Sequence, residues 1–191
     1  FPYKIKIRQN GKPLWTEHPV ADVAVMYVGI PNEADYQIME MGYLADDDTL
    51  KKYEIHPGDE LNCLGYPLNV EANNAGFPIL RSGKIASYPI TPTSAASALL
   101  YDFNIFAGNS GGPVYFASNW RAYGGSIHAG DIAFVIGLVS EQKIVREEIK
   151  SLNEVRFEEH RLGLAIIVPA TAIKETIKLL PEKPIVAQES K

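Results

Sequence analysis

The residues best suited to chemistry lie together in Gly108-Asn109-Ser110-Gly111-Gly112-Pro113, which an apolar run follows. A serine hydroxyl that attacks a carbonyl must sit on a sharp turn whose backbone N–H groups point at the developing oxyanion. Glycine adopts the backbone angles of such a turn and lets a substrate approach closely. We therefore predict that Ser110 is a nucleophile and that Gly108, Asn109 and Ser110 form the oxyanion hole, with the N–H groups of Gly108 and Ser110 as donors. The alternative is a Gly-rich turn with an exposed serine.

This segment resembles the nucleophile motif of trypsin-like serine peptidases, and other segments narrow the likeness to the HtrA-like branch. The matching segments follow the order of the family: 22–25, 58–67, 102–116, 135–140 and 162–180. The resemblance implies an all-β fold of two six-stranded antiparallel β-barrels with a C-terminal helix. It also implies a serine endopeptidase that works through an acyl-enzyme on Ser110, takes a polypeptide substrate and needs no cofactor.

Asp22 is the triad acid that the resemblance implies. The family's aspartate stands directly before an apolar strand, as Asp22 stands before Val23-Ala24-Val25. Such a carboxylate fixes the tautomer of the catalytic histidine and stabilises the imidazolium. The alternative for Asp22 is an aspartate that caps a turn where a strand begins.

None of the four histidines stands where the resemblance requires the base. The family places its histidine upstream of the aspartate, across a hairpin, in a segment of the form Thr-x-x-His. No such segment precedes Asp22, so we expect the histidine and the first strands of an incomplete first barrel to lie upstream of this chain. His18, only four residues before Asp22, is in the wrong place for that geometry. The others are expected to be solvated surface side chains: His56, His128 and His160.

The resemblance also implies two sets of substrate-binding residues. The strand along which a bound peptide pairs contains Leu138, Val139 and Ser140, and the floor of the pocket for the residue before the scissile bond contains Asn104, Ile105 and Phe106. Because no pocket residue is acidic, we expect small or medium aliphatic side chains to be preferred over lysine and arginine. The alternative for Ile105 and Phe106 is ordinary core.

The elements that must position these residues are mainly strands separated by turns. Asn10-Gly11 predicts a hairpin, 23–28 reads as a buried strand, and six further strands are expected at 60–64, 79–88, 98–103, 113–116, 132–140 and 162–168. We expect a loop over 117–130, and either a long hairpin or a helix-containing insertion over 141–161. An amphipathic helix is predicted at 173–180, where Pro181 ends it. The expected division is 1–50 for first-barrel strands and linker, 51–169 for the second barrel, and 170–191 for helix and tail.

Composition excludes several other functions. The net charge is −5 and there is no Lys/Arg-rich run, so we expect no nucleic-acid partner. No apolar run reaches transmembrane length, and no spacing is typical of a metal site. The single cysteine, Cys63, excludes an internal disulfide and favours an intracellular or bacterial periplasmic protein over a disulfide-stapled secreted one. We expect Cys63 to be a buried small hydrophobe, and a homo-oligomer or further domains outside this chain remain open.

Two alternative functions compete with the peptidase. The pattern Gly-x-Ser-x-Gly also fits the nucleophile elbow of α/β-hydrolases, but that elbow leads from a strand into a helix, whereas Pro113 leads into a β-like segment. The second alternative is a catalytically inactive trypsin-like scaffold that binds peptides or protein partners.

Overall fold

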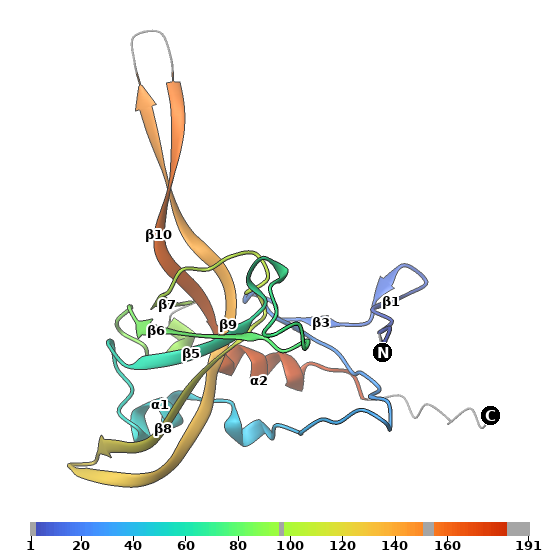
Figure 1. Ribbon diagram of the computed structural model, residues 1–191, viewed down its shortest axis with the longest axis horizontal. Helices are drawn as coiled ribbons and strands as arrows, with labels where there is room; N and C mark the ends of the chain where they lie inside the picture. Colours follow the sequence, from blue (N-terminus) through green and yellow to red (C-terminus); the bar gives the residue numbers. More distant parts are fainter. Residues whose placement is uncertain (1–2, 96–97, 151–154, 183–191) are drawn as a thin grey trace.

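The computed structural model describes residues 3–95, 98–150 and 155–182 (Figure 1). At its centre a six-stranded antiparallel sheet closes into a barrel, in the order β10-β7-β6-β5-β8-β9. The barrel strands are β5 (Glu60–Gly65), β6 (Ile79–Ile85), β7 (Leu99–Asp102), β8 (Pro113–Tyr123), β9 (Ser126–Lys150) and β10 (Val155–Pro169). The prediction of a mostly β chain with six strands after Gly58 is therefore confirmed.

Alternation along the barrel strands fills the core. Successive side chains of a strand point to opposite faces, so every second residue is buried. On β5 these are Leu61 and Cys63, and on β8 they are Val114 and Phe116. Burial raises the pKa of the Cys63 thiol to about 11, so this side chain stays neutral and serves as a small hydrophobe, as predicted.

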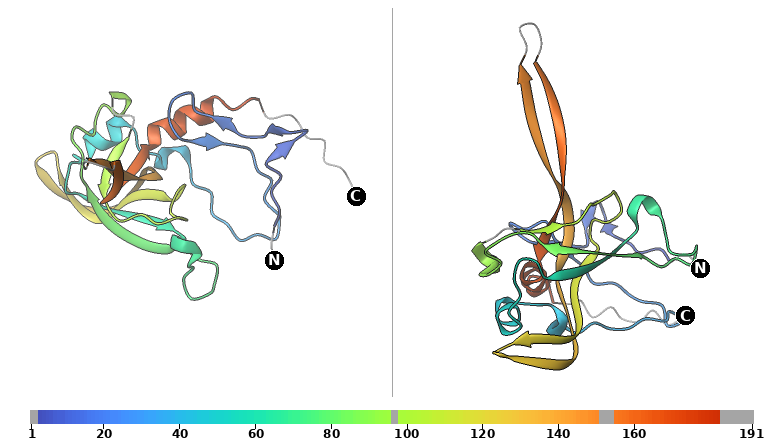
Figure 2. Two further views of the ribbon diagram at one scale, coloured as in Figure 1. Left: turned by 90° about the horizontal axis from the view of Figure 1, so that it is seen from above. Right: turned by 60° about the vertical axis from the view of Figure 1, so that its left-hand side comes forward.

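Two hairpins extend the barrel strands further than the sequence indicated. The loop expected over 117–130 is wrong, because β8 and β9 pair down to Tyr123 and Ser126. They turn at Gly124-Gly125, where both φ angles are positive, which glycine adopts without steric cost. The described parts of the region 141–161 are the paired strands of the hairpin alternative, since β9 and β10 pair from Glu141↔Ile166 out to Lys150↔Val155. We call residues 141–150 and 155–163 the arm, and it projects from the barrel in Figure 1 and in the right view of Figure 2.

The N-terminal residues form two small sheets beside the barrel. β1 (Arg8–Gln9) pairs with β2 (Lys12–Pro13) around the predicted Asn10-Gly11 turn, and β3 (Thr16–Glu17) pairs with β4 (Ala24–Val25). The buried strand expected over 23–28 is wrong in two respects: only Ala24 and Val25 have strand geometry, and of the six residues only Val23 is buried.

Helices connect these sheets. They are η1 (Met41–Tyr43), α1 (Asp47–Lys52), η2 (Pro67–Asn69), η3 (Thr93–Ala95) and the C-terminal α2 (Ala170–Lys178). α2 begins three residues before the predicted start, directly after Pro169. Its buried face joins the N-terminal segment to the outside of the barrel in one apolar cluster of Val23, Leu44, Val135, Val168, Ala170, Ala172 and Ile173.

An ion pair fixes α1 to α2. Asp46 caps α1 by accepting a hydrogen bond from the backbone N–H of Thr49 at 3.0 Å. The Lys174 ammonium donates to the other carboxylate oxygen of Asp46 at 2.8 Å. Lys174, followed by Thr49, holds the pKa of the Asp46 carboxyl well below its ordinary value. The folded state thus favours the ionised carboxylate.

We expect Lys174→Met to flatten the acid dependence of stability. In the wild type the unfolded Asp46 binds its proton at a higher pH than the folded one, so this contribution to the free energy of unfolding is complete above about pH 5 and is lost as the pH falls toward 2. Urea titrations at pH 6, 4 and 3 should show a smaller loss in the variant. Lys178→Met, on the same helix but without an ion partner among the described residues, should keep the wild-type slope. Equal slopes for all three proteins would contradict the assignment.

Candidate active site

Ser110 lies on a turn between β7 and β8 that only glycine can complete. Gly108 has a φ of +94°, and a Cβ atom there would lie 2.0 Å from the carbonyl oxygen of Tyr66. That close approach accompanies a hydrogen bond, because the Tyr66 N–H donates to the Gly108 carbonyl at 3.0 Å. The turn is therefore attached to the end of β5.

Asn109 supports this turn from inside. Its side chain is only 1% exposed, and its Oδ1 accepts a hydrogen bond from the Phe106 N–H at 3.0 Å. Its backbone N–H donates to the Phe106 carbonyl at 3.0 Å, and its carbonyl accepts from the Gly112 N–H at 2.9 Å. The side chain of Asn109 thus holds the loop by local contacts, and within the described residues its buried Nδ2 has no partner.

Two backbone donors next to Ser110 are available to a ligand. The N–H of Gly111 is used, because it donates to the Val139 carbonyl at 2.7 Å. The N–H groups of Gly108 and Ser110, by contrast, have no acceptor among residues 3–95, 98–150 and 155–182. Unpaired N–H groups beside an exposed hydroxyl are what the stabilisation of an oxyanion requires.

Ser140 links Ser110 to Asp22. The Ser110 hydroxyl donates to the carbonyl oxygen of Ser140 at 2.8 Å, and the Ser140 hydroxyl donates to Asp22 Oδ2 at 2.6 Å. Ser140 sits at a β-bulge, since its neighbours Val139 and Glu141 pair with Ile167 and Ile166 and leave it without a partner position. Bulges redirect side chains, and here the bulge turns one residue toward both predicted catalytic groups.

The apolar cluster around α2 brings Asp22 to this place. Val23, the next residue, is buried with Val135 and Val168 of the barrel. Asp22 itself lies at the rim of a pocket of about 490 Å³, which Ser110 and Ser140 also line. Its Oδ1 has no donor within the described part of the chain, so the carboxylate can still accept a hydrogen bond.

His18 lines the same pocket but is engaged with other groups. Its Nδ1 accepts hydrogen bonds from the N–H groups of Val20 and Ala21, at 3.2 and 2.8 Å. That leaves the ring proton on Nε2, which lies 3.0 Å from Glu175 Oε2 on α2. Neither ring nitrogen is therefore directed at Ser110.

The remaining histidines lie elsewhere. They bond to local partners: His56 to the Pro57 carbonyl, His128 to the Tyr123 carbonyl, and His160 to Glu147 on the arm. All are exposed, as expected.

The two sets of predicted substrate residues have different surroundings. Leu138, Val139 and Ser140 line the pocket that contains Asp22 and Ser110. Asn104, Ile105 and Phe106 line neither that pocket nor a second one of about 340 Å³ on the other side of Ser110. Ile105 is buried in the barrel core, and Phe106 lies 5.4 Å from the Arg81 guanidinium.

One functional contact was missed by sequence reasoning. Ser140 is expected from the resemblance to bind substrate through its backbone, and nothing in the sequence indicates that its hydroxyl reaches a residue 118 positions away. The described residues contain no group of three or more His, Cys, Asp or Glu side chains that could hold a metal ion. None of their helices is long and apolar enough to cross a membrane.

Comparisons with models of protein families, with curated proteins and with solved structures find no match to this chain.

Proposed function

We propose that this chain is part of a trypsin-like, HtrA-like serine endopeptidase, with Ser110 as the nucleophile and Asp22 as the triad acid. The observation that carries the proposal is the Ser140 link, which holds the Ser110 hydroxyl and the Asp22 carboxylate at one pocket beside two unpaired N–H groups. Nucleophile, acid and oxyanion donors are three of the four components that acyl transfer by a serine triad needs.

The fourth component, a general base, comes in this proposal from an imidazole outside the 191 residues. The Ser110 proton points to the Ser140 carbonyl, which cannot take it away. A histidine in the pocket of about 490 Å³ would donate its Nδ1–H to Asp22 and accept the Ser110 proton at Nε2. The support for this source is that His18 bonds to Glu175 and the other three histidines bond to partners elsewhere.

The reaction follows from these roles. As the Ser110 proton moves to the imidazole, Oγ attacks the peptide carbonyl, and the oxyanion accepts hydrogen bonds from the N–H groups of Gly108 and Ser110. The C–N bond breaks, the amine leaves with the proton, and the acyl group stays on Ser110. The same imidazole then takes a proton from water, whose oxygen attacks the acyl carbon. The bond to Ser110 Oγ breaks, the acid product leaves, and the imidazolium returns the proton to Oγ.

An internal peptide bond fits the surroundings of Ser110. One pocket, lined by Leu138, Val139 and Ser140, lies on the side of Asp22, and the second is lined by the end of β5 and by Pro78. A polypeptide that crosses Ser110 would contact protein on both sides of the scissile bond, which favours an endopeptidase over an enzyme that removes terminal residues.

In this proposal the complete fold has two barrels, and residues 3–43 form part of the first barrel. Tyr3, Ile5 and Ile7 alternate along one exposed segment, and Val28 and Ile30 lie opposite across a pocket of about 460 Å³. Such an apolar surface needs a covering layer in water. We infer that further strands of a first barrel cover it.

A fluorophosphonate probe tests the nucleophile. In the presence of the expected histidine segment, we expect labelling of Ser110 within minutes, because its exposed hydroxyl lies beside the unpaired N–H groups of Gly108 and Ser110. Ser110→Ala should lose the label, and Ser126→Ala, at the β8–β9 turn, should keep it. Equal labelling of the wild type and Ser110→Ala, located by peptide mapping, would end the assignment.

An inactive scaffold that binds peptides is the second candidate. The observation that favours it is the arrangement of Ser110 and His18, whose hydrogen bonds go to Ser140 and Glu175 and not to each other. Persistent failure of labelling, together with measurable peptide binding, would support this candidate.

A further inference from the structure

The arm leaves one edge of β9 unpaired, starting at the candidate active site. β9 pairs with β8 only up to Leu138, and the backbone of Val139 is used by Gly111 and Gly112. From Glu141 to Lys150 the strand pairs with β10 on its other edge. Within the described residues nothing pairs with this part of β9 on the side of β8, so a row of backbone N–H and C=O groups starts directly after Ser140.

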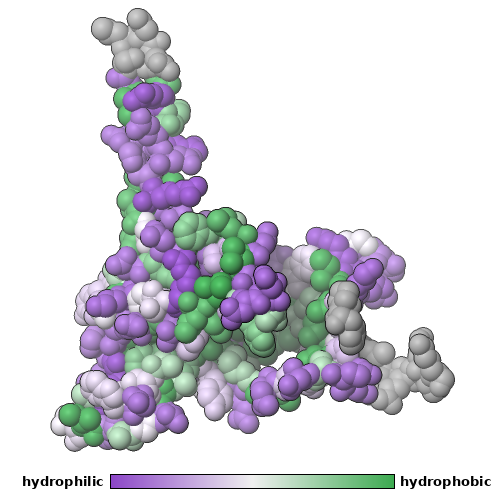
Figure 3. All heavy atoms as spheres, in the orientation of Figure 1, coloured by the Kyte–Doolittle hydropathy of each residue, from purple (hydrophilic) through white to green (hydrophobic). Residues whose placement is uncertain are grey.

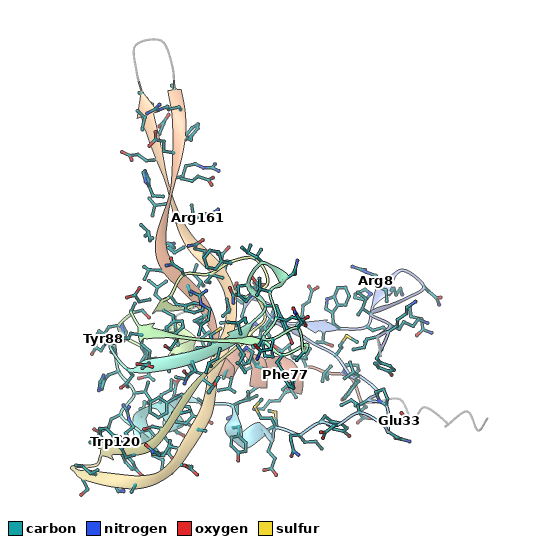
Figure 4. The ribbon with its side chains drawn as sticks, in the orientation of Figure 1. Arg8, Glu33, Phe77, Tyr88, Trp120 and Arg161 are labelled. Carbon is teal, nitrogen blue, oxygen red and sulfur yellow. The ribbon has the colours of Figure 1, made fainter. Side chains whose placement is uncertain are left out.

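The arm stands alone in solvent. In Figure 1 and in the right view of Figure 2 no other element lies against its outer half, and Figure 4 shows Arg161 on the arm and Trp120 on the opposite hairpin. A two-stranded ribbon is marginally stable in water, and a third strand or a covering layer is usually needed. The free edge of β9 is therefore a place where an added strand would gain backbone hydrogen bonds and stabilise the arm.

Most of the charged side chains of the arm form ion pairs. Arg146 pairs with Glu159 at 2.7 Å and His160 lies 2.9 Å from Glu147, and two further pairs join neighbours on one strand: Lys150–Glu148 and Arg156–Glu158. Glu141, Lys143 and Arg161 have no ion pair within the described residues. A partner would also meet the backbone edge and the exposed apolar side chains of the arm, which are Ile144, Val145, Val155, Phe157 and Leu162. The surface of the arm is accordingly a mixture of hydrophilic and hydrophobic patches (Figure 3).

We propose that residues 143–150 of β9 bind, by strand addition, the part of a polypeptide substrate that lies well before the scissile bond. The inference rests on the proposed function, because it takes the occupant to be the chain that Ser110 attacks. The occupant is an extended, unfolded segment with apolar side chains, running antiparallel to β9 so that its amino-terminal part points to the tip of the arm. Eight residues of strand span about 27 Å, so recognition extends that far beyond the pocket.

Continuity favours this occupant over a second copy of the chain. The free edge is the direct continuation of the strand whose Ser140 contacts the nucleophile, so an extended peptide that reaches Ser110 meets this edge next. Main-chain pairing supplies affinity with little sequence preference, which suits an arm most of whose charged side chains are already paired.

Peptides of graded length test the proposal without requiring catalysis. Fluorescent mixed-sequence peptides of 4, 8 and 12 residues, each with valine at the carboxyl end, are titrated into the chain and followed by anisotropy. We expect the dissociation constant to fall at least tenfold from 4 to 12 residues. In a short-arm variant, with residues 146–159 replaced by Asn-Gly between the opposed Val145 and His160, this gain should disappear.

A half-arm variant provides the matched control. In this variant residues 149–156 are replaced by Asn-Gly between Glu148 and Phe157. Its affinity should rise from the 4-residue to the 8-residue peptide but not further. If the short-arm variant does not fold, this variant is used in its place. A length gain that survives in both folded variants, or no gain in the intact chain, would overturn the proposal.

An arm-dependent dimer in sedimentation without length dependence would overturn it in favour of a second copy. If length dependence holds but Ser110 is not labelled by fluorophosphonate, the peptidase proposal fails and the arm remains a peptide-binding edge; the reverse result removes the arm proposal alone.

Discussion

Free imidazole is expected to accelerate the hydrolysis of an activated acyl ester by this chain at least tenfold. The physical reason is that Ser110 lacks a base in its present hydrogen bonds, while the adjoining pocket of about 490 Å³ opens onto both Ser110 and Asp22. A positioned general base contributes about 10²–10⁴-fold, and a diffusing one contributes less because it is not held in place. Absorbance of the p-nitrophenolate released from a p-nitrophenyl ester, followed across an imidazole series, measures the effect.

The pH profile and the variants separate this effect from ordinary buffer catalysis. Only neutral imidazole accepts a proton, so the enzymic rate should rise with pH through about 6–7 and then level off. Ser110→Ala should abolish the part of the hydrolysis rate that saturates as the imidazole concentration rises. Asp22→Asn, which keeps the shape of the side chain and removes its charge, should lose most of it. Loss of activity in His18→Gln would identify His18 as the base and contradict an outside source.

Gly108→Ala is expected to reduce the stability of the turn and the reactivity of Ser110 more than any other single methyl addition there. It combines a φ of +94° with a Cβ position 2.0 Å from the Tyr66 carbonyl oxygen, which belongs to backbone and cannot rotate away. Loss of one oxyanion donor by displacement costs about 10²–10³ in rate. The imidazole-assisted ester assay and urea unfolding measure the two effects.

Alanine substitutions at two neighbouring glycines separate the effect of a positive φ from the effect of steric overlap. At Gly111 the φ is +80° but no atom lies within 4 Å of the position that a methyl group would take, so alanine should cost only the backbone penalty, about 1–2 kcal/mol. At Gly112 a Cβ would lie 2.1 Å from the Leu64 carbonyl oxygen while φ is not positive, so steric overlap alone acts, at about 1–3 kcal/mol. A Gly108→Ala variant less affected than Gly111→Ala would contradict the account of the turn.

The barrel could be predicted best where its strands are short, alternating and bounded by turn residues. β5 and β7 lie within one residue of their predicted ranges. β8 and β9 continue further because Gly124-Gly125 is a two-residue hairpin turn, a signal that the surrounding small and polar residues obscure. The sequence of the arm is compatible with either a long hairpin or a helix-containing insertion, because its mixture of charged and apolar residues has neither a clear helical nor a clear strand period.

The site was predictable only where its residues are neighbours in the sequence. Gly108, Ser110 and the turn between them follow from local backbone requirements. Asp22 lies near the turn because Val23 packs against Val135 and Val168. No local sequence pattern reveals that packing. The contact between His18 and Glu175 joins residues 157 positions apart and likewise needed the fold.

β9 gives the molecule a mechanical property. A single strand of 25 residues runs from the β8–β9 turn, past Ser140 beside the proposed nucleophile, to Lys150 on the arm, with no loop between them. A loop would absorb tension, whereas a continuous hydrogen-bonded strand transmits it. If a chain binds to the arm as proposed, traction on it would act on the bulge that positions Ser140, and through it on the Ser110 hydroxyl and the Asp22 carboxylate.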